Sequence, residues 1–209
     1  MSTPLEQIRQ QIARHDAEVV SRLAQRAVCG VAPAGFYPVG WSGPLFRRLA
    51  KEAAFPPALE SFQARIEAGF TRSVLPTLIP DAKVGTTTGA DDMRRAADAD
   101  AIAAIAIRLG LSLQVAACKF AGRDTRLRAA AEAGDAAEIE TLITFPSVEQ
   151  LVLLRVRSCA AEHIRACNLP SPLADRLPAA LDAIYSDWLI PLSRAIQATW
   201  LIQAATREP

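Results

Sequence analysis

Two cations, Arg108 and Lys119, stand eleven residues apart in the apolar stretch ADADAIAAIAIRLGLSLQVAACKF. In a helix, eleven residues make about three turns, so both side chains lie on one face, about 16 Å apart along the axis. A guanidinium and an ammonium in this arrangement can lean toward one bound anion. The surrounding Ala, Ile, Leu and Val residues indicate burial, and buried cations need a partner. That partner is either a ligand or a carboxylate of the chain, for which Asp98, Asp124 and Glu149 are the candidates.

The composition is typical of a soluble globular protein with a substantial core. At 209 residues, 51% of them apolar, the chain has enough material for one large domain or two small ones. Its net charge of +1 provides no basic surface for nucleic acid or for an anionic membrane. The N-terminal segment has no hydrophobic signal core, and charges are expected to interrupt the apolar stretches before the about 18 residues of a membrane span. We therefore expect a cytoplasmic protein with neither nucleic acid nor a membrane as partner.

The cysteines have no metal-ligand spacing, so no metal site is expected. Two of them, Cys118 and Cys159, fall inside apolar helical patterns. We interpret all four, which also include Cys29 and Cys167, as reduced packing residues, in keeping with a cytoplasmic location.

Nearly every periodic segment is helical, and no run of alternating β-branched residues predicts a strand. The first helix is expected to start at Pro4, capped by Ser2 or Thr3 with Glu6 in its first turn, and to continue to about Cys29. Its apolar stripe is expected to face the core and consists of Leu5, Ile8, Ile12, Val19 and Leu23.

The rest of the chain is expected to form further helices, which gives an all-α bundle. A loop rich in glycine and proline follows the first helix. The expected helices are 43–54, 57–79 with a kink at Pro76, a long helix over about 91–121, 125–133, 135–143, one from Pro146, and a last one over about 172–205 interrupted by Pro191. The segment 80–90 contains VGTTTGA and is expected to be a flexible connection.

Two segments of the chain resemble each other. The sequence YSDWLIPLSRAI near the C-terminus and FTRSVLPTLIP in the first half share an aromatic residue, an apolar pair and a proline at the same offset. This similarity suggests that the bundle contains an internally duplicated helical unit.

Two motifs resemble the all-helical chorismate mutases. The N-terminal LEQIRQQIARHDAEVVSRLAQRA is similar to the first helix of that family, which has an apolar residue, then IR, then ID or a variant, and a closing ER. The segment RLGLSLQVAACKF is similar to the second signature, an Arg and a Lys eleven residues apart around a VA pair.

The resemblance is greatest to the longer, eukaryotic-type branch found in yeast and plants. The segments that match this branch are ITFPSVE over 143–149 and YSDWLIPLS over 185–193. The present chain is a shortened form, with the missing residues mainly between its first helix and Ala90. The resemblance implies a single all-helical domain over 1–209, whose first half is degenerate or structural and whose second half carries most of the site.

Chorismate mutases convert chorismate to prephenate by an intramolecular Claisen rearrangement, without a cofactor. The protein must hold a dianion in its reactive conformer and stabilise the charge that builds on the breaking ether oxygen. The resemblance implies that Arg9 and Arg108 each bind a carboxylate, as suits the bidentate guanidinium. It also implies that Lys119 donates to the ether oxygen.

Three further residues receive roles from the resemblance. Glu149 would accept from the ring hydroxyl, Ser193 would assist at a carboxylate, and Gln197 would be the second donor to the ether oxygen. The yeast branch has a glutamate at the position of Gln197, which donates only when protonated, so we expect the amide to extend activity through neutral pH. Phe145 replaces a polar residue of that branch and removes one polar contact from the hydroxyl end of the pocket.

The expected function is therefore chorismate mutase activity in the synthesis of phenylalanine and tyrosine, by a cytoplasmic homodimer. One alternative is an isochorismate-pyruvate lyase, an activity that occurs on the same scaffold. Another is a non-catalytic helical binding or regulatory protein. Partial decay is suggested in the first half, because Tyr37, in a loop, stands eleven residues beyond Arg26 where a lysine would be needed.

Overall fold

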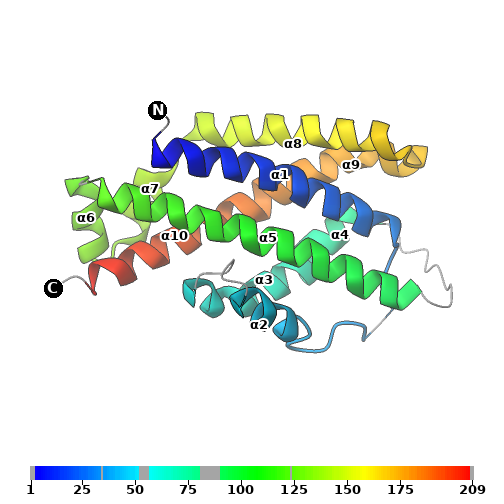
Figure 1. Cartoon of the computed structure of the whole chain (residues 1–209), viewed down its shortest axis with the longest axis horizontal. Helices are drawn as coiled ribbons and strands as arrows, with labels where there is room; N and C mark the ends of the chain where they lie inside the picture. Colours follow the sequence, from blue (N-terminus) through cyan, green and yellow to red (C-terminus); the bar gives the residue numbers. More distant parts are fainter. Residues whose placement is uncertain (1–2, 34, 52–56, 81–89, 123, 208–209) are drawn as a thin grey trace.

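A computed structural model describes residues 3–33, 35–51, 57–80, 90–122 and 124–207 of the chain. Within these ranges the protein contains helices and no strand, which confirms the all-α prediction. The long helices lie lengthwise and give the molecule an elongated shape (Figure 1). Their bounds are α1 Pro4–Val28, α5 Ala90–Ala121, α8 Pro146–Cys167, α9 Ser171–Ile184 and α10 Ile190–Ala205.

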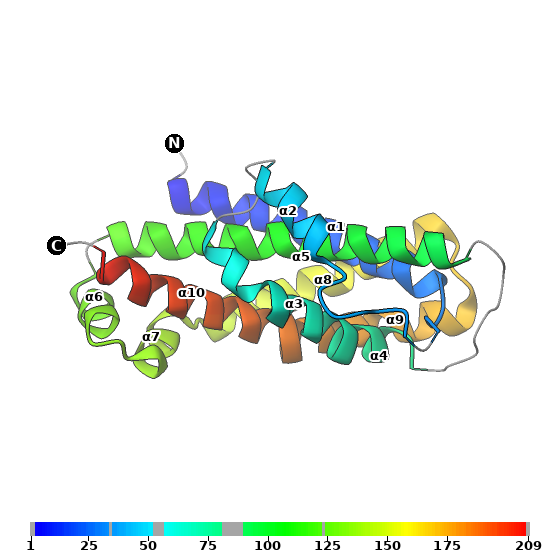
Figure 2. The same cartoon turned by 90° about the horizontal axis from the view of Figure 1, so that it is seen from below.

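The shorter helices cover the sides and one end of the bundle. The α6 and α7 helices lie at the end where α5 and α10 finish, and α2 and α3 lie against one side (Figures 1 and 2). The bounds of these helices and of α4 are α2 Gly43–Lys51, α3 Gln63–Gly69, α4 Leu75–Leu78, α6 Thr125–Glu132 and α7 Ala136–Ile143. A 3-10 segment over Pro57–Phe62 precedes α3. The predicted 43–54 helix therefore ends at Lys51 within the described residues, and the expected flexible connection falls largely on 81–89, outside them.

Local sequence sets the helix ends. At the start of α1, the Thr3 side chain accepts from the Glu6 backbone N–H and the Glu6 side chain accepts from the Thr3 N–H, which is a capping box. Pro4 takes the first helical position, where its missing N–H costs no hydrogen bond. Asp124 and Asp135 cap α6 and α7 through their carboxylates. The Thr3 cap and the start at Pro4 agree with the prediction, while Ser2 lies outside the described residues.

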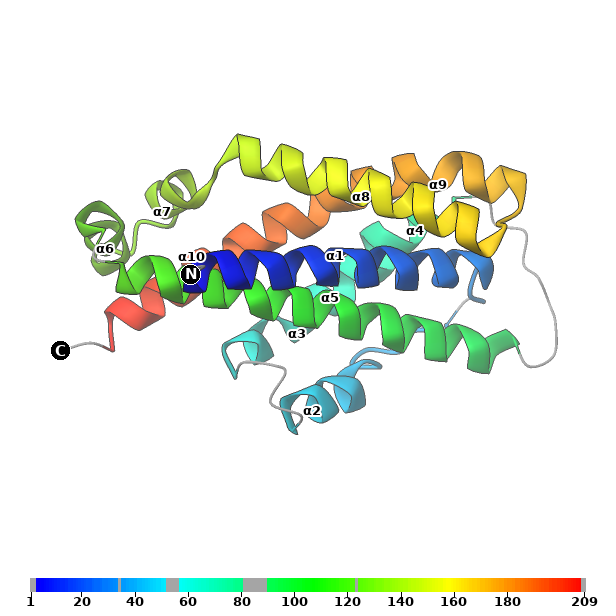
Figure 3. The same cartoon turned by 45° about the horizontal axis from the view of Figure 1, so that its top comes forward.

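The pairing of α1 with α5 organises the core. The two helices run antiparallel and in contact, and α8 also packs on α1 (Figures 1 and 3). The inner half of the predicted α1 stripe is fully buried, as Val19 and Leu23 show. Its outer members Leu5, Ile8 and Ile12 are only partly buried, and Ile12 lines a cavity.

One described helix, α5, is long and apolar enough to cross a membrane, contrary to the expectation that charges interrupt every such stretch. However, 67% of its most apolar window is buried inside the protein. The α5 helix therefore has the position of a core helix, covered by α1, α10 and α3.

Both segments of the internal sequence similarity form the same local structure. Residues Phe70–Val74 and Tyr185–Leu189 each form a wide π-helical turn, and Pro76 and Pro191 follow at the same offset. A proline inside an α-helix clashes with the carbonyl four residues earlier and removes a hydrogen bond, and a widened turn accommodates both effects. The expected kink at Pro76 and the expected interruption at Pro191 are therefore π turns that end just before each proline.

Candidate active site

A cavity of about 270 Å³ lies among α1, α5, α8 and α10, near the end of the bundle that carries α7. Cationic and hydroxyl side chains converge on it from all four helices, between apolar residues such as Ile12 and Val152. Every site residue predicted from the sequence lines this cavity, namely Arg9, Arg108, Lys119, Glu149, Ser193 and Gln197.

The α5 helix supplies one wall of the cavity. Arg108, Ser112, Val115 and Lys119 are spaced four, three and four residues apart, so they form one stripe along the helix. The eleven-residue spacing therefore places both cations on the same cavity, as the periodicity predicts.

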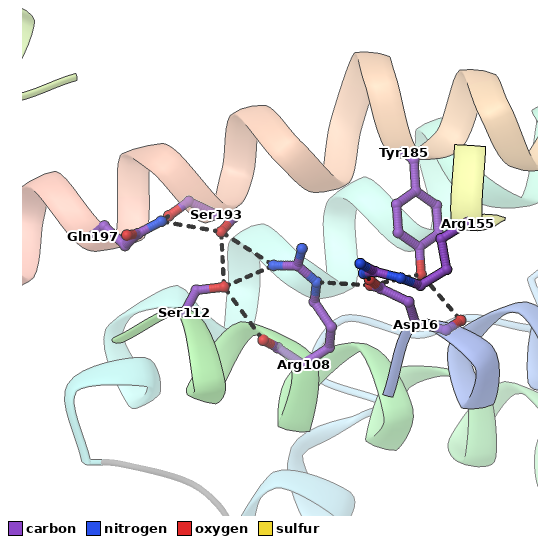
Figure 4. A network of polar contacts seen from close by, with 7 residues as sticks. All are labelled: Asp16, Arg108, Ser112, Arg155, Tyr185, Ser193 and Gln197. Carbon is purple, nitrogen blue, oxygen red and sulfur yellow. Dashed lines mark hydrogen bonds and ion pairs between the residues drawn. The ribbon is translucent and has the colours of Figure 1, made fainter. Parts of the chain in front are cut away.

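Arg108 is a buried arginine at the centre of a polar network (Figure 4). Its Nε donates to Asp16 Oδ1 at 3.2 Å, and its Nη1 donates to Ser112 Oγ at 2.7 Å and to Ser193 Oγ at 3.4 Å. Its Nη2 donates to none of the described residues, so that this end of the guanidinium is available to a ligand.

The acidic partner of Arg108 is Asp16, a residue that the sequence reasoning did not select. Its carboxylate is 0% exposed and also accepts from Arg155 Nη1 at 3.0 Å and from the Tyr185 hydroxyl at 3.3 Å. Burial and this carboxylate raise the pKa of Tyr185 well above its usual value. The three donors compensate the buried charge of Asp16.

The carboxylates proposed from the sequence as partners of Arg108 and Lys119 are engaged elsewhere. Asp98 pairs with Arg26, Asp124 caps α6, and Glu149 lies 3.6 Å from Arg194 Nη1. The prediction that one of these three carboxylates pairs with Arg108 or Lys119 was therefore wrong, and a different aspartate, Asp16, neutralises Arg108.

Lys119 has no carboxylate partner among the described residues. Its Nζ donates to the Ile143 carbonyl oxygen at 3.2 Å and lies 4.6 Å from the centroid of the Phe145 ring. Burial and the nearby charge of Arg9 lower the pKa of Lys119 from 10.5 to about 8. A half-buried ammonium beside another cation is a favourable place for an anion to bind.

Arg9 likewise makes no ion pair with a described residue. The sequence offered Glu6 and Asp16 as neighbours, but Glu6 closes the capping box and Asp16 pairs with Arg108 and Arg155. Arg9, which is exposed on α1, and Lys119, which is half-buried on α5, thus line one cavity without an acidic partner in the described part of the chain.

Glu149 lies in the first turn of α8, where the helix dipole favours a carboxylate. Its neighbour Arg194, which the sequence reasoning missed, lines the cavity and has a buried Nε without a hydrogen-bond partner in the described ranges. Arg155 was missed as well. Arg155 lies three residues after Val152 on the side of α8 that lines the cavity, and this helical spacing could have identified it.

Ser193 and Gln197 lie one turn apart on α10 and both face the cavity. Ser193 Oγ donates to Ser112 Oγ at 2.9 Å. The Gln197 amide Nε2 donates within its own helix, to the Ser193 carbonyl at 3.2 Å and to Ser193 Oγ at 3.3 Å (Figure 4). The amide therefore supplies a neutral donor at the edge of the cationic wall.

The first half of the chain holds a counterpart of this network. Asp98 and Arg26 form a buried ion pair between the same two helices, and the Tyr37 hydroxyl donates to Asp98 Oδ2 at 2.9 Å. The Arg26 guanidinium also donates to the Tyr37 oxygen at 3.1 Å and to the Gly30 carbonyl at 2.7 Å. All three of its nitrogens are thus occupied. These contacts agree with the predicted degenerate first half, which stays a prediction.

Within the described ranges, no group of three or more His, Cys, Asp or Glu side chains lies close enough together to bind a metal ion. The four cysteines are free in the described ranges, where Cys29, Cys118 and Cys159 are partly buried and Cys167 is exposed, so the packing role expected for Cys167 was wrong.

A scan against protein-family models finds no match, and a search of curated protein sequences finds none either. Solved structures do match, over nearly the whole chain. The chorismate mutase Aro7p of Candida albicans, in complex with L-Trp, aligns with a TM-score of 0.74 at 17% identity, covering 98% of this chain and 93% of that one. AtCM1 with phenylalanine bound in an allosteric site aligns with a TM-score of 0.73 at 19% identity, covering 95% of each chain.

AtCM1 with tyrosine bound in the allosteric site gives a TM-score of 0.72 at 19% identity, with 96% of each chain covered. The protein therefore has the all-helical fold of the eukaryotic-type chorismate mutases, as the sequence resemblance implies. At these identities the comparisons establish the fold, and the reaction must be argued from the residues of the cavity.

Proposed function

We propose that this protein is a chorismate mutase, which rearranges chorismate to prephenate in the cavity among α1, α5, α8 and α10. One observation supports the proposal above all. In a fold shared with chorismate mutases, Arg9 and Lys119 line one cavity without acidic partners among the described residues, and Arg108 lines the same cavity with an Nη2 that donates to none of them. Chorismate is a compact dianion, and its two carboxylates match this charge.

The first task of the site is to hold the substrate in its reactive conformer. Arg9 and Arg108 lie on different helices, and each binds one carboxylate of the substrate. Ser193, already within reach of Arg108, adds a hydroxyl at the same end. Fixing both carboxylates brings the reacting carbons together, so that much of the entropic cost of the rearrangement is met at binding.

The second task is to stabilise the negative charge that develops on the ether oxygen as its bond to carbon breaks. Lys119 donates to that oxygen from one side and Gln197 from the other. Both side chains line the same cavity, where a donor shielded from bulk water stabilises a developing charge strongly. No covalent intermediate, proton transfer or bound cofactor is needed for this step.

Glu149 orients the ring by accepting from its hydroxyl. Its carboxylate lies 3.6 Å from Arg194 Nη1, and both residues line the cavity. The position that is polar in the yeast branch is occupied by Phe145, so Glu149 carries the recognition of the hydroxyl group.

The proposal extends to the setting of the enzyme. We place it in the synthesis of phenylalanine and tyrosine, in the cytoplasm and as a homodimer, as the resemblance implies. Sedimentation-velocity measurements on the purified chain test the dimer directly.

The decisive experiment follows chorismate absorbance with the wild type, Lys119→Ala and a matched control. Loss of a donor to the developing charge is expected to lower turnover by about 100-fold or more. The control is Lys51→Ala, which removes an exposed lysine in the last turn of α2, away from the cavity. It is expected to retain full activity, and circular dichroism checks that both variants keep their helices.

The other candidate functions give different results in the same experiment. Release of pyruvate from isochorismate, without loss of chorismate, would identify a lyase. Binding of prephenate without turnover of either substrate would identify a non-catalytic protein. Either outcome would refute the proposed mutase.

A further inference from the structure

Phe145 breaks a local rule of helix formation. It is the N-cap residue of α8, with φ −127° and ψ 97°, and no side chain caps the helix there. N-caps favour Ser, Thr, Asp or Asn, whose side chains accept from the first turn, and Asp124 and Asp135 do this for α6 and α7. A residue that violates a structural preference without structural benefit is a candidate for a functional role.

The Phe145 ring is not used for core packing. It is 47% exposed, belongs to neither buried apolar cluster and lines the candidate active site. Pro146 follows it and restricts the backbone of the preceding residue to extended conformations, which fixes the direction in which the ring projects.

The ring faces Lys119. The ammonium nitrogen lies 4.6 Å from the ring centroid, within the range of a cation–π interaction. The ammonium also donates to the carbonyl oxygen of Ile143, two residues before Phe145. The turn between α7 and α8 thus supplies both electron-rich groups that contact Lys119 in the described part of the protein.

The charged groups on the cavity wall around Lys119 are mostly positive. They are Arg9 on α1, Arg108 on α5, Glu149 and Arg155 on α8, and Arg194 on α10. The carboxylate of Glu149 is engaged with Arg194, so it does not balance the ammonium directly. Without a bound anion, the ring and one carbonyl are what favours a charged Lys119.

We propose that Phe145 is a positioning residue for Lys119, whose ring face, with the Ile143 carbonyl, holds the ammonium at the cavity wall and favours its charged form. The part of this inference in which the ammonium acts on an ether oxygen rests on the proposed function. The interaction itself exists in the free protein and can be measured there.

The charge of Lys119 needs this support, because burial and Arg9 lower its pKa to about 8. A further decrease would leave a substantial fraction of the side chain neutral near physiological pH. A neutral amine is a much weaker donor to a developing negative charge. Replacing the ring by an aliphatic group of similar bulk keeps the burial and removes the π face.

The experiment titrates Lys119 by NMR in the ligand-free protein, following the side-chain carbon next to the ammonium. The chain has only three lysines, Lys51, Lys83 and Lys119, so assignment is direct. Phe145→Leu is expected to lower the pKa of Lys119 by about half a pH unit, and Phe145→Trp, which keeps a π face, is expected to maintain it. The matched control is Leu154→Ala, because Leu154 is also exposed on α8, at 57%, and does not line the cavity.

An unchanged pKa of Lys119 in Phe145→Leu would overturn the proposal, as would an equal change in the Leu154→Ala control. Where the wild type is active, Phe145→Leu should also lower kcat/KM by about threefold above pH 8.5, with recovery in Phe145→Trp. If the wild type does not turn over chorismate but the pKa changes as expected, the role of Phe145 is supported and the mutase proposal fails.

Discussion

Asp16→Asn keeps the size of a buried side chain and removes the charge that neutralises Arg108. Asp16 is fully buried and accepts from Arg108, Arg155 and Tyr185. The asparagine has one acceptor oxygen and places a donor amide against cations. The variant therefore separates two effects, the stability given by the buried ion pair and the competition between Asp16 and a ligand for Arg108.

The size of the stability effect follows from burial. Removing one partner of a buried ion pair costs about 3–5 kcal/mol, because the other charge is left uncompensated. For a protein of this length, about 1 kcal/mol corresponds to about 2–4 °C in Tm, so the variant should melt about 6–20 °C below the wild type. Asp98→Asn breaks the equivalent pair with Arg26 and should lose a similar amount.

The assay measures Tm with and without prephenate, the dianion that the proposed reaction would form. Asp98 lies away from the cavity, so Asp98→Asn should show the same ligand-induced rise in Tm as the wild type. In Asp16→Asn, prephenate supplies the charge that Arg108 lacks, and the rise should be larger. Equal rises in the two variants would show that Asp16 does not compete with the ligand for Arg108, and a normal Tm for Asp16→Asn without ligand would show that the buried ion pair does not stabilise the fold.

Three further changes have defined outcomes. Gln197→Glu should confine activity to acidic pH, because a carboxyl group donates only when protonated, and a pH–rate profile unchanged from the wild type would count against the assigned role. For the wild type, the pKa of Lys119 near 8 means that the ammonium of the free protein is present below that pH and lost above it, so kcat/KM should fall through about pH 8. Because a bound anion raises this pKa, calorimetry in buffers of different ionisation enthalpy should detect proton uptake when prephenate binds at pH 8. Gly69→Ala would place a Cβ 2.0 Å from Trp188 Nε1, and the overpacking should cost about 1–3 kcal/mol in a urea unfolding experiment, whereas an unchanged midpoint would show that the indole moves aside freely.

Spacing along single helices was sufficient to predict much of the candidate site. The stripe from Arg108 to Lys119 depends only on helix geometry, and the cavity contains both residues. The start of α1 was predictable for the same reason, since Thr3, Pro4 and Glu6 act locally. The roles assigned to the cavity residues depend on the resemblance and stay predictions.

Contacts between helices were not predictable in this way. Asp16 lies 92 positions from Arg108 in the sequence, and its role depends on how α1 and α5 align. One signal was present, because each helix carries an aspartate ten residues before an arginine, Asp16 with Arg26 and Asp98 with Arg108. In an antiparallel pair this arrangement produces two crossed ion pairs, but the sequence alone did not give the alignment.

The π turn before Pro191 determines where the polar side chains of α10 are directed. A π turn adds one residue to a helical repeat, and each residue rotates the following side chains by about 100°. In α9 the inward positions are apolar, as with Leu181, whereas beyond the wide turn Ser193 and Gln197 face the cavity. Deleting a single residue from Tyr185–Leu189 would change the rotation of α10 by about 100° and turn the Ser193 hydroxyl and the Gln197 amide away from the cavity. The number of residues in this π turn thus determines which side chains of α10 face the cavity.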